Sequence, residues 1–470
     1  MATALNQIRQ IDGVGAGRLQ KVLSFAEQHL KRLPRRSGES YFMHGCEVAV
    51  ALSECTKDMS LLSVAVLHDI LVHPDGEQLL IAAPLTREEQ SLIRRLHPLR
   101  RLHIDANTED LDLVIDAFTE DPKLLPLRMA HRLNDIRRLS RFSRGLRLHI
   151  ANETLHMYTA IAGRLGLHAW RHEMEDACFP VVQPKIAVAL EQKIQSMHSL
   201  DGSCLSQSVK FLNRELKKQG IHATLTTRRK TLYSTYRKMA IKKRRFEELT
   251  DRLAIRIVVG KQHQCYLALG IVHSVFHPMP GKLKDYIGAP KENGYRSIHT
   301  VVYPLPGVTE QPIEIQIRTK EMHEECEFGA IKHGEYKNAL YALEARPGRV
   351  NLFRSLALLK EEARQPKQFT EALRTYFRDD HIALFDTKNN LYHMRSPVSA
   401  LDFVCHAYGK RVLHLKSVHI NGRERPIVTH VHDGDTITAL FGKKKILQKE
   451  WLSSCWHLSL KRQMREWLQS

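Results

Sequence analysis

The chain has 470 residues, too many for one hydrophobic core, so we expect two to four domains. Its 71 lysine and arginine residues exceed its 51 acidic residues by 20, which favours polyanionic partners such as nucleotides, RNA or an anionic surface, although the same excess also serves solubility alone. The sequence has no run of 18 apolar residues and no secretory leader pattern, so we expect a cytoplasmic protein without a membrane partner.

The eight cysteines are scattered and include no Cys-x-x-Cys pair. This spacing argues against a disulfide framework and against a cysteine-based zinc site, and it predicts thiols in a reducing compartment.

Residues 1–195 have the pattern of an all-α domain. In "MHGCEVAVALSEC", "LLSVAVLHDILV" and "ETLHMYTAIAGRLG", apolar residues recur at three- and four-residue spacing. This is the period of a helix with one buried face. Few β-branched runs bounded by turns occur here, so strands are not expected.

Residues 196–345 predict an α/β domain. "SVKFLNRELKKQG" is an amphipathic helix that ends at Gly220, and "TLYSTYRKMAIKKRRFEELTD" is also helical in pattern. "LAIRIVVG" is a short β-branched run closed by glycine, typical of a buried strand, and "QCYLALGIVHSVF" returns to helix. "SIHTVVYPL" and "PIEIQIRT" are two strands joined by a Pro/Gly turn, which predicts a hairpin.

The remaining residues divide into three segments. We expect a helical connector at 346–379, and a small β-rich domain at 380–442 in which "HIALFDTKNNLYHM" forms strand, turn and strand. Residues 443–470 are a basic helical tail that contains tryptophan. This tail is expected either to touch RNA or to lie against the small domain.

Charged residues gather near the strands of the central domain. Asp251 opens one strand, and Glu314, Gln316 and Arg318 alternate along another, so these three share one face. Two carboxylates near a polar sheet face suit Mg²⁺, which is held by one or two carboxylates together with substrate phosphates. Cationic residues nearby would act on a transferring phosphoryl group, although each of them taken alone is more typical of a solvated surface. These residues are Arg228, Lys230, Lys238, Lys284 and Lys291.

Residues 205–340 resemble the synthetase domain of the RelA/SpoT family, which makes the alarmones ppGpp and pppGpp. The resemblance is carried in order by "TRRKTLYSTYRKM", "TDRLAIRI", "GKLKDYIGAPKENGYRSIHT" and "EIQIRTKEMHEECEFGAIKHGEYK". It implies an α/β nucleotidyltransferase-like domain that moves the β,γ-pyrophosphate of ATP to the ribose 3′-hydroxyl of GTP or GDP.

The resemblance also implies the site residues. Asp251 corresponds to a magnesium ligand, and Glu314 to the general base or magnesium partner. Tyr295 corresponds to a tyrosine that stacks on guanine, and stacking of a base on an aromatic ring contributes about 1–3 kcal/mol. The implied ATP-binding residues are Arg228, Lys230, Ser234 and Lys238. The other implied residues for the acceptor nucleotide are Lys284, Asp285, Lys291, Asn293, His299 and Gln316.

Three positions depart from the family pattern. Thr227 and Arg229 replace a glycine and a proline at the entry to the ATP site, and Gly334 replaces a tryptophan. These departures bear on rate and regulation more than on the type of reaction.

The N-terminal region resembles the family's second domain, an HD-type hydrolase that removes the 3′-pyrophosphate with a manganese ion. "RRSGESYFMHGCEVAVAL" supplies Arg36 near the guanine site and His44 as a metal ligand. "VAVLHDILVHP" supplies His68 and Asp69.

The catalytic Glu-Asp pair of this hydrolase pattern is replaced. Val72 and His73 stand in its place, His131 stands where an aspartate ligand is expected, and Asp135 replaces an asparagine. Without the carboxylate pair nothing is left to activate water, so we expect the domain to be inactive, regulatory and without its Mn²⁺ site. For the degenerate site of His44, His68, Asp69 and His131, the preferred interpretation is that these are packed core residues inherited from an active ancestor. A nitrogen-rich zinc site is the alternative, and Asp75 and Glu77 leave weak hydrolysis open.

Residues 380–442 resemble a β-grasp-like TGS domain through "DTKNNLYHMRSPVSALDFVCHAYG" and "INGRERPIVTHVHDGDTI". In long family members this domain reads the 3′ end of uncharged tRNA on the ribosome, so both are possible partners here, with His406 or His414 as candidate contacts. Two other functions stay open. One is a toxin-like enzyme that pyrophosphorylates the tRNA 3′ end, and the other is a non-catalytic nucleotide or tRNA sensor.

Overall fold

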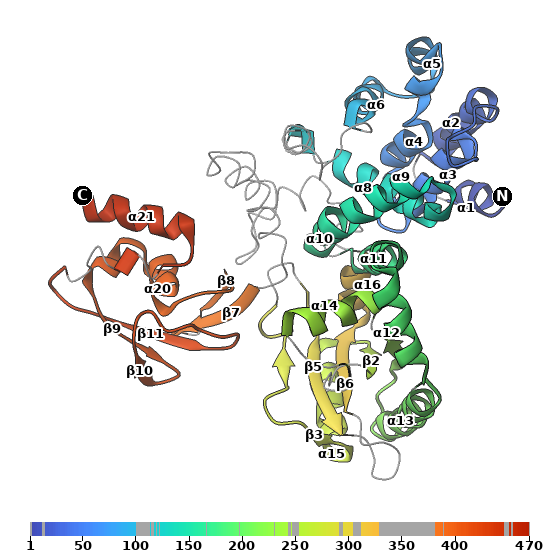
Figure 1. Ribbon diagram of the computed structural model, residues 1–470. Coiled ribbons are helices and arrows are strands. Elements are labelled where there is room, and N and C mark those ends of the chain that lie inside the picture. The colour runs from blue at the N-terminus through green and yellow to red at the C-terminus, as the bar shows by residue number, and fades with distance from the viewer. Residues whose placement is uncertain are drawn as a thin grey trace. The chain divides into compact units, whose positions relative to one another are not determined.

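The computed structural model describes most of the chain and divides it into two compact units, the second of which contains residues 378–470 (Figure 1). The described residues are 2–11, 15–99, 113, 117–118, 120–121, 123–165, 167–196, 198–229, 231–242, 246, 253–290, 295–303, 312–328, 381–388, 390–445, 451–452 and 455–469. The expected connector at 346–379 lies outside them.

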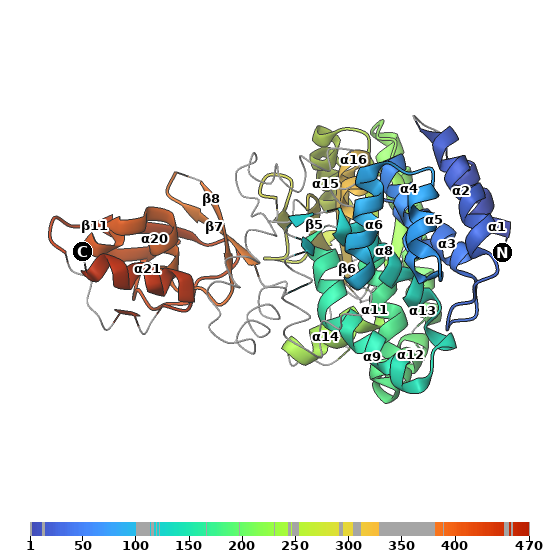
Figure 2. The ribbon, with the colours of Figure 1, turned by 90° about the horizontal axis from the view of Figure 1, so that it is seen from above.

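The first unit begins with a helical domain, as the apolar periodicity predicts. Its core is one cluster of buried side chains that extends from Ile8 to Cys178. Helix α3 packs on both α4 and α8 within it (Figures 1 and 2). The helices in this part of the chain are α1 (Ala2–Arg9), α2 (Ala16–Leu30), α3 (Tyr41–Ser53), α4 (Met59–Leu67), α5 (Gly76–Ala82), α6 (Arg87–Leu99), α8 (Leu124–Arg137), α9 (Arg144–Glu153), α10 (Thr159–Arg164), α11 (His168–Val182), α12 (Pro184–Ser196) and α13 (His198–Lys218).

Capping residues determine where α3 and α4 begin, and a glycine allows the two helices to cross closely. Ser40 caps α3 by accepting a hydrogen bond from the Met43 amide, and Asp58 caps α4 in the same way. Gly45 lies at the crossing, where an added Cβ would stand 2.2 Å from the carbonyl oxygen of Val66. The missing side chain therefore lets the two helices approach closely just beside His44.

A mixed sheet follows, with the strand order β1-β2-β6-β5-β3 and β4 paired to β5. Strands β2 and β6 pair in parallel, and the other pairs are antiparallel, including the β5–β6 hairpin that the sequence predicts. Helices α13 and α15 contact this sheet (Figure 1). The elements are β1 (Thr224–Arg229), α14 (Leu232–Lys242), β2 (Leu253–Val259), α15 (Gln262–Val275), β3 (His277–Pro278), β4 (Lys284–Asp285), β5 (Ile298–Tyr303), β6 (Ile313–Thr319) and α16 (Lys320–Phe328).

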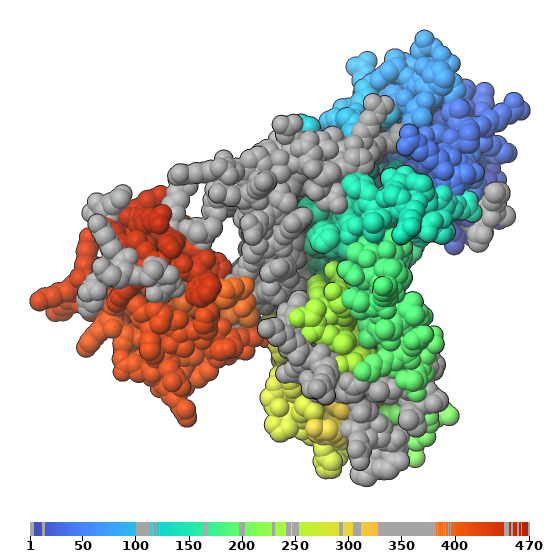
Figure 3. All heavy atoms as spheres, in the orientation of Figure 1, coloured from blue at the N-terminus to red at the C-terminus, as the bar shows by residue number. Residues whose placement is uncertain are grey.

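The second unit is a five-stranded sheet with the order β10-β9-β11-β7-β8. The β7–β8 pair is antiparallel, which confirms the predicted strand, turn and strand. Leu460 and Met464 of α21 are buried in the core of this unit, so the tail packs on the sheet domain, while its outer face lies on the surface (Figure 3). The elements are β7 (His381–Asp386), β8 (Leu391–Arg395), α20 (Ala400–Tyr408), β9 (Leu415–Ile420), β10 (Arg423–Arg425), β11 (Thr436–Phe441) and α21 (Leu458–Gln469).

Two expectations drawn from composition can be compared with the structure. All eight cysteines are buried, and none forms a disulfide. Among the described helices, none combines the length and the apolar character needed to cross a membrane.

Candidate active site

The polar face of the first sheet is built by strand register. Glu314 of β6 lies opposite Ala254 of β2 and Val301 of β5. In the next row, Gln316 lies between Arg256 and His299. Because alternate residues of a strand share a face, these side chains point to one side of the sheet, while the isoleucines of β6 fill the core on the other.

A chain of hydrogen bonds links Glu314 to Tyr295 across this face. The Tyr295 hydroxyl lies 2.7 Å from His299 Nε2, and His299 Nδ1 lies 3.0 Å from Glu314 Oε1. Gln316 Nε2 donates to Glu314 Oε2 at 3.3 Å. Burial raises the pKa of Tyr295 well above its ordinary value, so its hydroxyl stays protonated. The Glu314 carboxylate can only accept, so His299 donates to it from Nδ1 at the end of the chain.

Tyr295 as a whole residue is partly buried, and other side chains surround its ring. Tyr286, His168 and His299 contact it in perpendicular arrangements, with centroid separations of 6.0, 5.9 and 5.6 Å. The guanidinium of Arg318 lies 5.9 Å from the ring centroid. His168 comes from α11, so the helical region reaches the ring that the resemblance assigns to guanine.

Two more residues expected at the acceptor nucleotide lie at the outer edge of the sheet. Lys284 is exposed on β4, opposite His299. Asp285 accepts hydrogen bonds from the Tyr266 hydroxyl at 3.0 Å and the Ile287 amide at 2.9 Å, which fixes the turn after β4. Lys284 therefore shares the register row of Gln316 and His299.

The residues expected at ATP are described in part. Ser234 and Lys238 lie four positions apart on α14, which places them on one side of that helix. Arg228 lies in β1 opposite Ala254, the register partner of Glu314, but its side chain is outside the described set. Lys230, Asp251, Lys291 and Asn293 lie outside the described residues. The pairing of Asp251 with Glu314 therefore stays a prediction, and Glu314 offers a carboxylate on the polar face that suits one Mg²⁺ ligand.

Sequence reasoning missed Arg256. Its side chain lies on the same face as Glu314 and Gln316, and its Nη2 atom is 3.1 Å from Glu327 Oε1 of α16. The alternation Ala254, Arg256, Val258 was available in the sequence. The pairing of β2 with β6, which makes this alternation face the site, was not.

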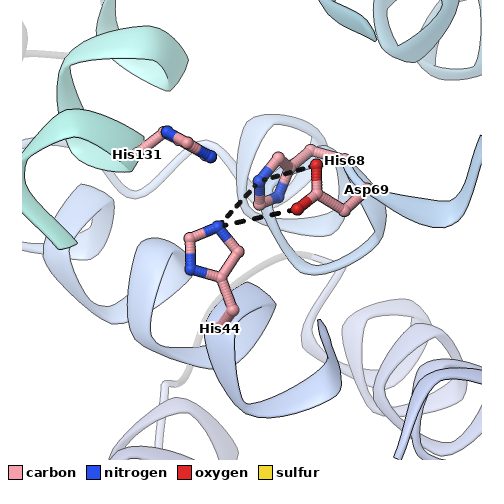
Figure 4. Close-up of side chains that lie close together, drawn as sticks. All are labelled: His44, His68, Asp69 and His131. Carbon is pink, nitrogen blue, oxygen red and sulfur yellow. Dashed lines mark hydrogen bonds and ion pairs between the residues drawn. The ribbon is translucent and has the colours of Figure 1, made fainter. Parts of the chain in front are cut away.

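The N-terminal domain gathers a second group of polar side chains (Figure 4). His44 lies on α3, His68 and Asp69 follow α4, and His131 lies on α8. All four are buried, and one potential ligand atom from each lies within 4.8 Å of every other. Burial lowers the pKa of His131 to about 4 and also lowers that of His44, so these imidazoles are neutral near pH 7.

A cavity of about 580 Å³ adjoins this cluster and is lined in part by Arg35, Arg36, Tyr41, Val72 and Asp135. Val72, at the position of a family carboxylate, is partly exposed and apolar. The alternative carboxylate Glu77 instead lies 3.1 Å from Arg94 in an exposed ion pair.

The comparisons with known proteins agree with two of the resemblances. Residues 227–340 match the family model described as a region found in RelA / SpoT proteins, and residues 23–168 match an HD domain. Both matches end by residue 340, so the TGS interpretation of 380–442 stays a prediction.

Curated relatives match the chain at greater length. The GTP pyrophosphokinase rsh of Brucella melitensis is 30% identical over 444 residues, which are 93% of this chain and 59% of that protein. A guanosine-3′,5′-bis(diphosphate) 3′-pyrophosphohydrolase of Aquifex aeolicus is 30% identical over 440 residues, 93% of this chain and 62% of that protein. The chain thus spans about three fifths of the length of these relatives.

Proposed function

We propose that this chain, a member of the RelA/SpoT homologue family, is a cytoplasmic pyrophosphokinase that makes pppGpp or ppGpp from ATP and GTP or GDP. The observation that carries the proposal is the hydrogen-bonded chain from Glu314 through His299 to Tyr295 on the polar face of the sheet. It joins a carboxylate that can accept a proton to an aromatic ring that can hold a base.

In the proposed reaction, the ribose 3′-oxygen attacks the β-phosphorus of ATP and the bond between the α,β-bridging oxygen and that phosphorus breaks. AMP leaves, and the 3′-hydroxyl proton passes to Glu314. A carboxylate serves as a base only within hydrogen-bond reach of the proton, which is why Glu314 must lie where Tyr295 holds the guanosine. Mg²⁺ bound by Asp251 and Glu314 would neutralise the charge of the transferred phosphates.

The nucleotides would be held from two sides of the face. Arg228, Lys230, Ser234 and Lys238 would bind ATP. Lys284, Lys291, His299 and Gln316 would contact the acceptor, with Asp285 and Asn293 shaping its loop. The row of Lys284, His299 and Gln316 across three strands supports this division, because His299 in this row contacts the Tyr295 hydroxyl.

Replacing Tyr295 with alanine is expected to raise KM for GDP about 5- to 150-fold, because stacking of about 1–3 kcal/mol is lost. Tyr295→Phe keeps the ring but removes the hydroxyl that orients His299, so it should leave KM nearly unchanged and lower kcat a few-fold. Initial rates at varied GDP concentration measure both constants.

The matched control is Tyr303→Ala, which removes an exposed tyrosine from the end of β5, the strand that follows Tyr295, and should change neither constant. If Tyr295→Ala has the KM of the unmodified protein, the ring does not hold the acceptor base.

We infer that the N-terminal domain regulates and does not hydrolyse, because Val72 places an apolar group at the cavity where a catalytic carboxylate is required. With added Mn²⁺, ppGpp should stay intact for hours while the Aquifex aeolicus relative, named a hydrolase, degrades it in parallel. Chromatography of the nucleotides measures the loss. Steady release of pyrophosphate by this chain would show that the domain has kept a working base.

The C-terminal sheet domain is proposed to be TGS-like and to bind uncharged tRNA on the ribosome. Its strand pair β7–β8, with α20 and the returning strands, supports this interpretation. Transfer of pyrophosphate to a tRNA 3′ end is the competing activity. The half-buried Tyr295 beside Glu314 favours a free guanine nucleotide.

A further inference from the structure

We propose that His44, His68, Asp69 and His131 bind one zinc ion in a closed four-ligand site, in place of the manganese ion that the hydrolase resemblance implies. The four residues come from three helical segments of the N-terminal domain and are all buried (Figure 4). The inference does not depend on the pyrophosphokinase activity.

The spacing of the ligand atoms suits a tetrahedral ion. With metal–ligand bonds of 2.0–2.1 Å, neighbouring ligand atoms of a tetrahedral zinc site are about 3.3 Å apart. His44 Nε2 lies 3.2 Å from His68 Nε2 and 3.8 Å from Asp69 Oδ2, and His68 Nε2 lies 3.5 Å from Asp69 Oδ1. No two of the four ligand atoms are more than 4.8 Å apart.

The hydrogen bonds around two of the imidazoles orient their Nε2 atoms toward one another. His68 Nδ1 lies 2.7 Å from the carbonyl oxygen of Ala65 and donates to it, so the Nε2 lone pair of His68 points toward His44 Nε2, 3.2 Å away. His44 Nδ1 lies between Asn134 Oδ1 at 2.7 Å and Arg35 Nη1 at 2.9 Å, which fixes the orientation of its ring. A metal ion at this point would bind both Nε2 atoms.

His131 and Asp135 supply the third imidazole and its support. These residues stand where the family pattern has an aspartate and an asparagine, one helical turn apart on α8. Asp135 Oδ2 lies 3.3 Å from His131 Nδ1, which places a carboxylate beside the ring although no hydrogen bond is formed. Both ring nitrogens of His131 are buried and make no hydrogen bond to the described residues, so Nε2 is available to a metal ion.

The donor set decides between the two metals. Three imidazoles and one carboxylate suit zinc, whereas manganese prefers carboxylate, carbonyl and water ligands. Nearby carboxylates also offset the added charge. A dication and Arg35 face Glu39, Asp69 and Asp135, while Arg138 pairs with Glu39 and Glu47. Four protein ligands leave no position for water, so the ion would join α3, α4 and α8 without hydrolysing a substrate.

The test uses the full chain without a polyhistidine tag, freed of metal by a chelator and then dialysed against Zn²⁺. Elemental analysis should find one zinc per chain that resists gel filtration, and none in His131→Ala. Asp135→Asn should weaken zinc binding about 10- to 100-fold. His156→Ala, which removes an exposed histidine outside the cluster, is the matched control and should keep its zinc.

Two further measurements test the proposal even if His131→Ala fails to fold. The chain loaded with Co²⁺ should show the intense visible absorption of a four-coordinate site. His131→Asp should lower the affinity for zinc and raise the affinity for Mn²⁺. Electron paramagnetic resonance of the free Mn²⁺ measures the second change. The proposal is overturned if the unmodified chain retains zinc no better than His131→Ala does. A Co²⁺ spectrum typical of six-coordination would also overturn it, as would Mn²⁺ binding by the unmodified chain that is as tight as that of His131→Asp.

Discussion

Glu314→Gln is expected to lower the rate of pyrophosphate transfer about 10²- to 10⁴-fold, the usual contribution of a general base. Glutamine keeps the size of the side chain but cannot take the proton of the 3′-hydroxyl. It also places an amide where His299 and Gln316 now donate to two carboxylate oxygens. Steady-state formation of ppGpp from ATP and GDP measures the loss, and KM for GDP should change little because Tyr295 is retained.

Glu321→Gln is the matched control, since this exposed glutamate lies at the start of α16, next to β6 but outside the hydrogen-bonded chain. It should keep full activity. Equal rates for Glu314→Gln and the unmodified chain would remove the carboxylate from the mechanism. Thermal melting of both variants separates a catalytic loss from unfolding.

Arg132→Ala should destabilise the N-terminal domain by about 3–5 kcal/mol, because it leaves the buried carboxylate of Glu153 without its counter-charge. Both side chains are almost fully buried, and they form a direct ion pair. The Arg132 guanidinium also lies 4.4 Å from the centre of the Tyr158 ring. For a domain of this size, the melting temperature should fall by on the order of 10 °C, as measured by calorimetry.

An exposed ion pair provides the comparison. Lys31 and Glu27 lie one helical turn apart on the surface, 2.9 Å apart, so Lys31→Ala should cost no more than about 1 kcal/mol. Replacing both Arg132 with methionine and Glu153 with leucine should recover most of the stability, since no unpaired charge then remains. A single Arg132→Ala variant that melts like Lys31→Ala would show that the pair is solvated.

Much of the secondary structure was predictable because each element carries its own periodicity. The three- and four-residue spacing around His44 and His68 marks helices that bury a full face, and the alternation of Ile313, Ile315 and Ile317 marks a strand with one side in the core. The β5–β6 hairpin follows from a short turn between two such runs. The parallel pairing of β2 with β6 joins residues about sixty positions apart, and no local pattern encodes it.

The candidate sites divide in the same way. Placing Glu314 and Gln316 on one face needs only strand alternation, so the sequence predicts it. Arg256 joins that face only through the β2–β6 register, which sequence reasoning lacked. For the histidine cluster, the sequence left buried core residues and a metal site as alternatives. The deciding facts are the close approach of the four side chains and the orientation of His68 by the Ala65 carbonyl oxygen, and the first of these depends on three helices meeting.

The measurement that tests the proposed function most directly is transfer of label from ATP carrying it on the β-phosphorus. The full chain is incubated with Mg²⁺ and, in separate reactions, GTP, GDP or uncharged tRNA, with Glu314→Gln in parallel. We expect label on GTP or GDP, none on tRNA, and almost none with the variant. Label on the tRNA 3′ end alone, or no labelled product with any acceptor, would contradict the account. In that account, Glu314 takes the proton from the 3′-hydroxyl of a guanosine that is stacked on Tyr295.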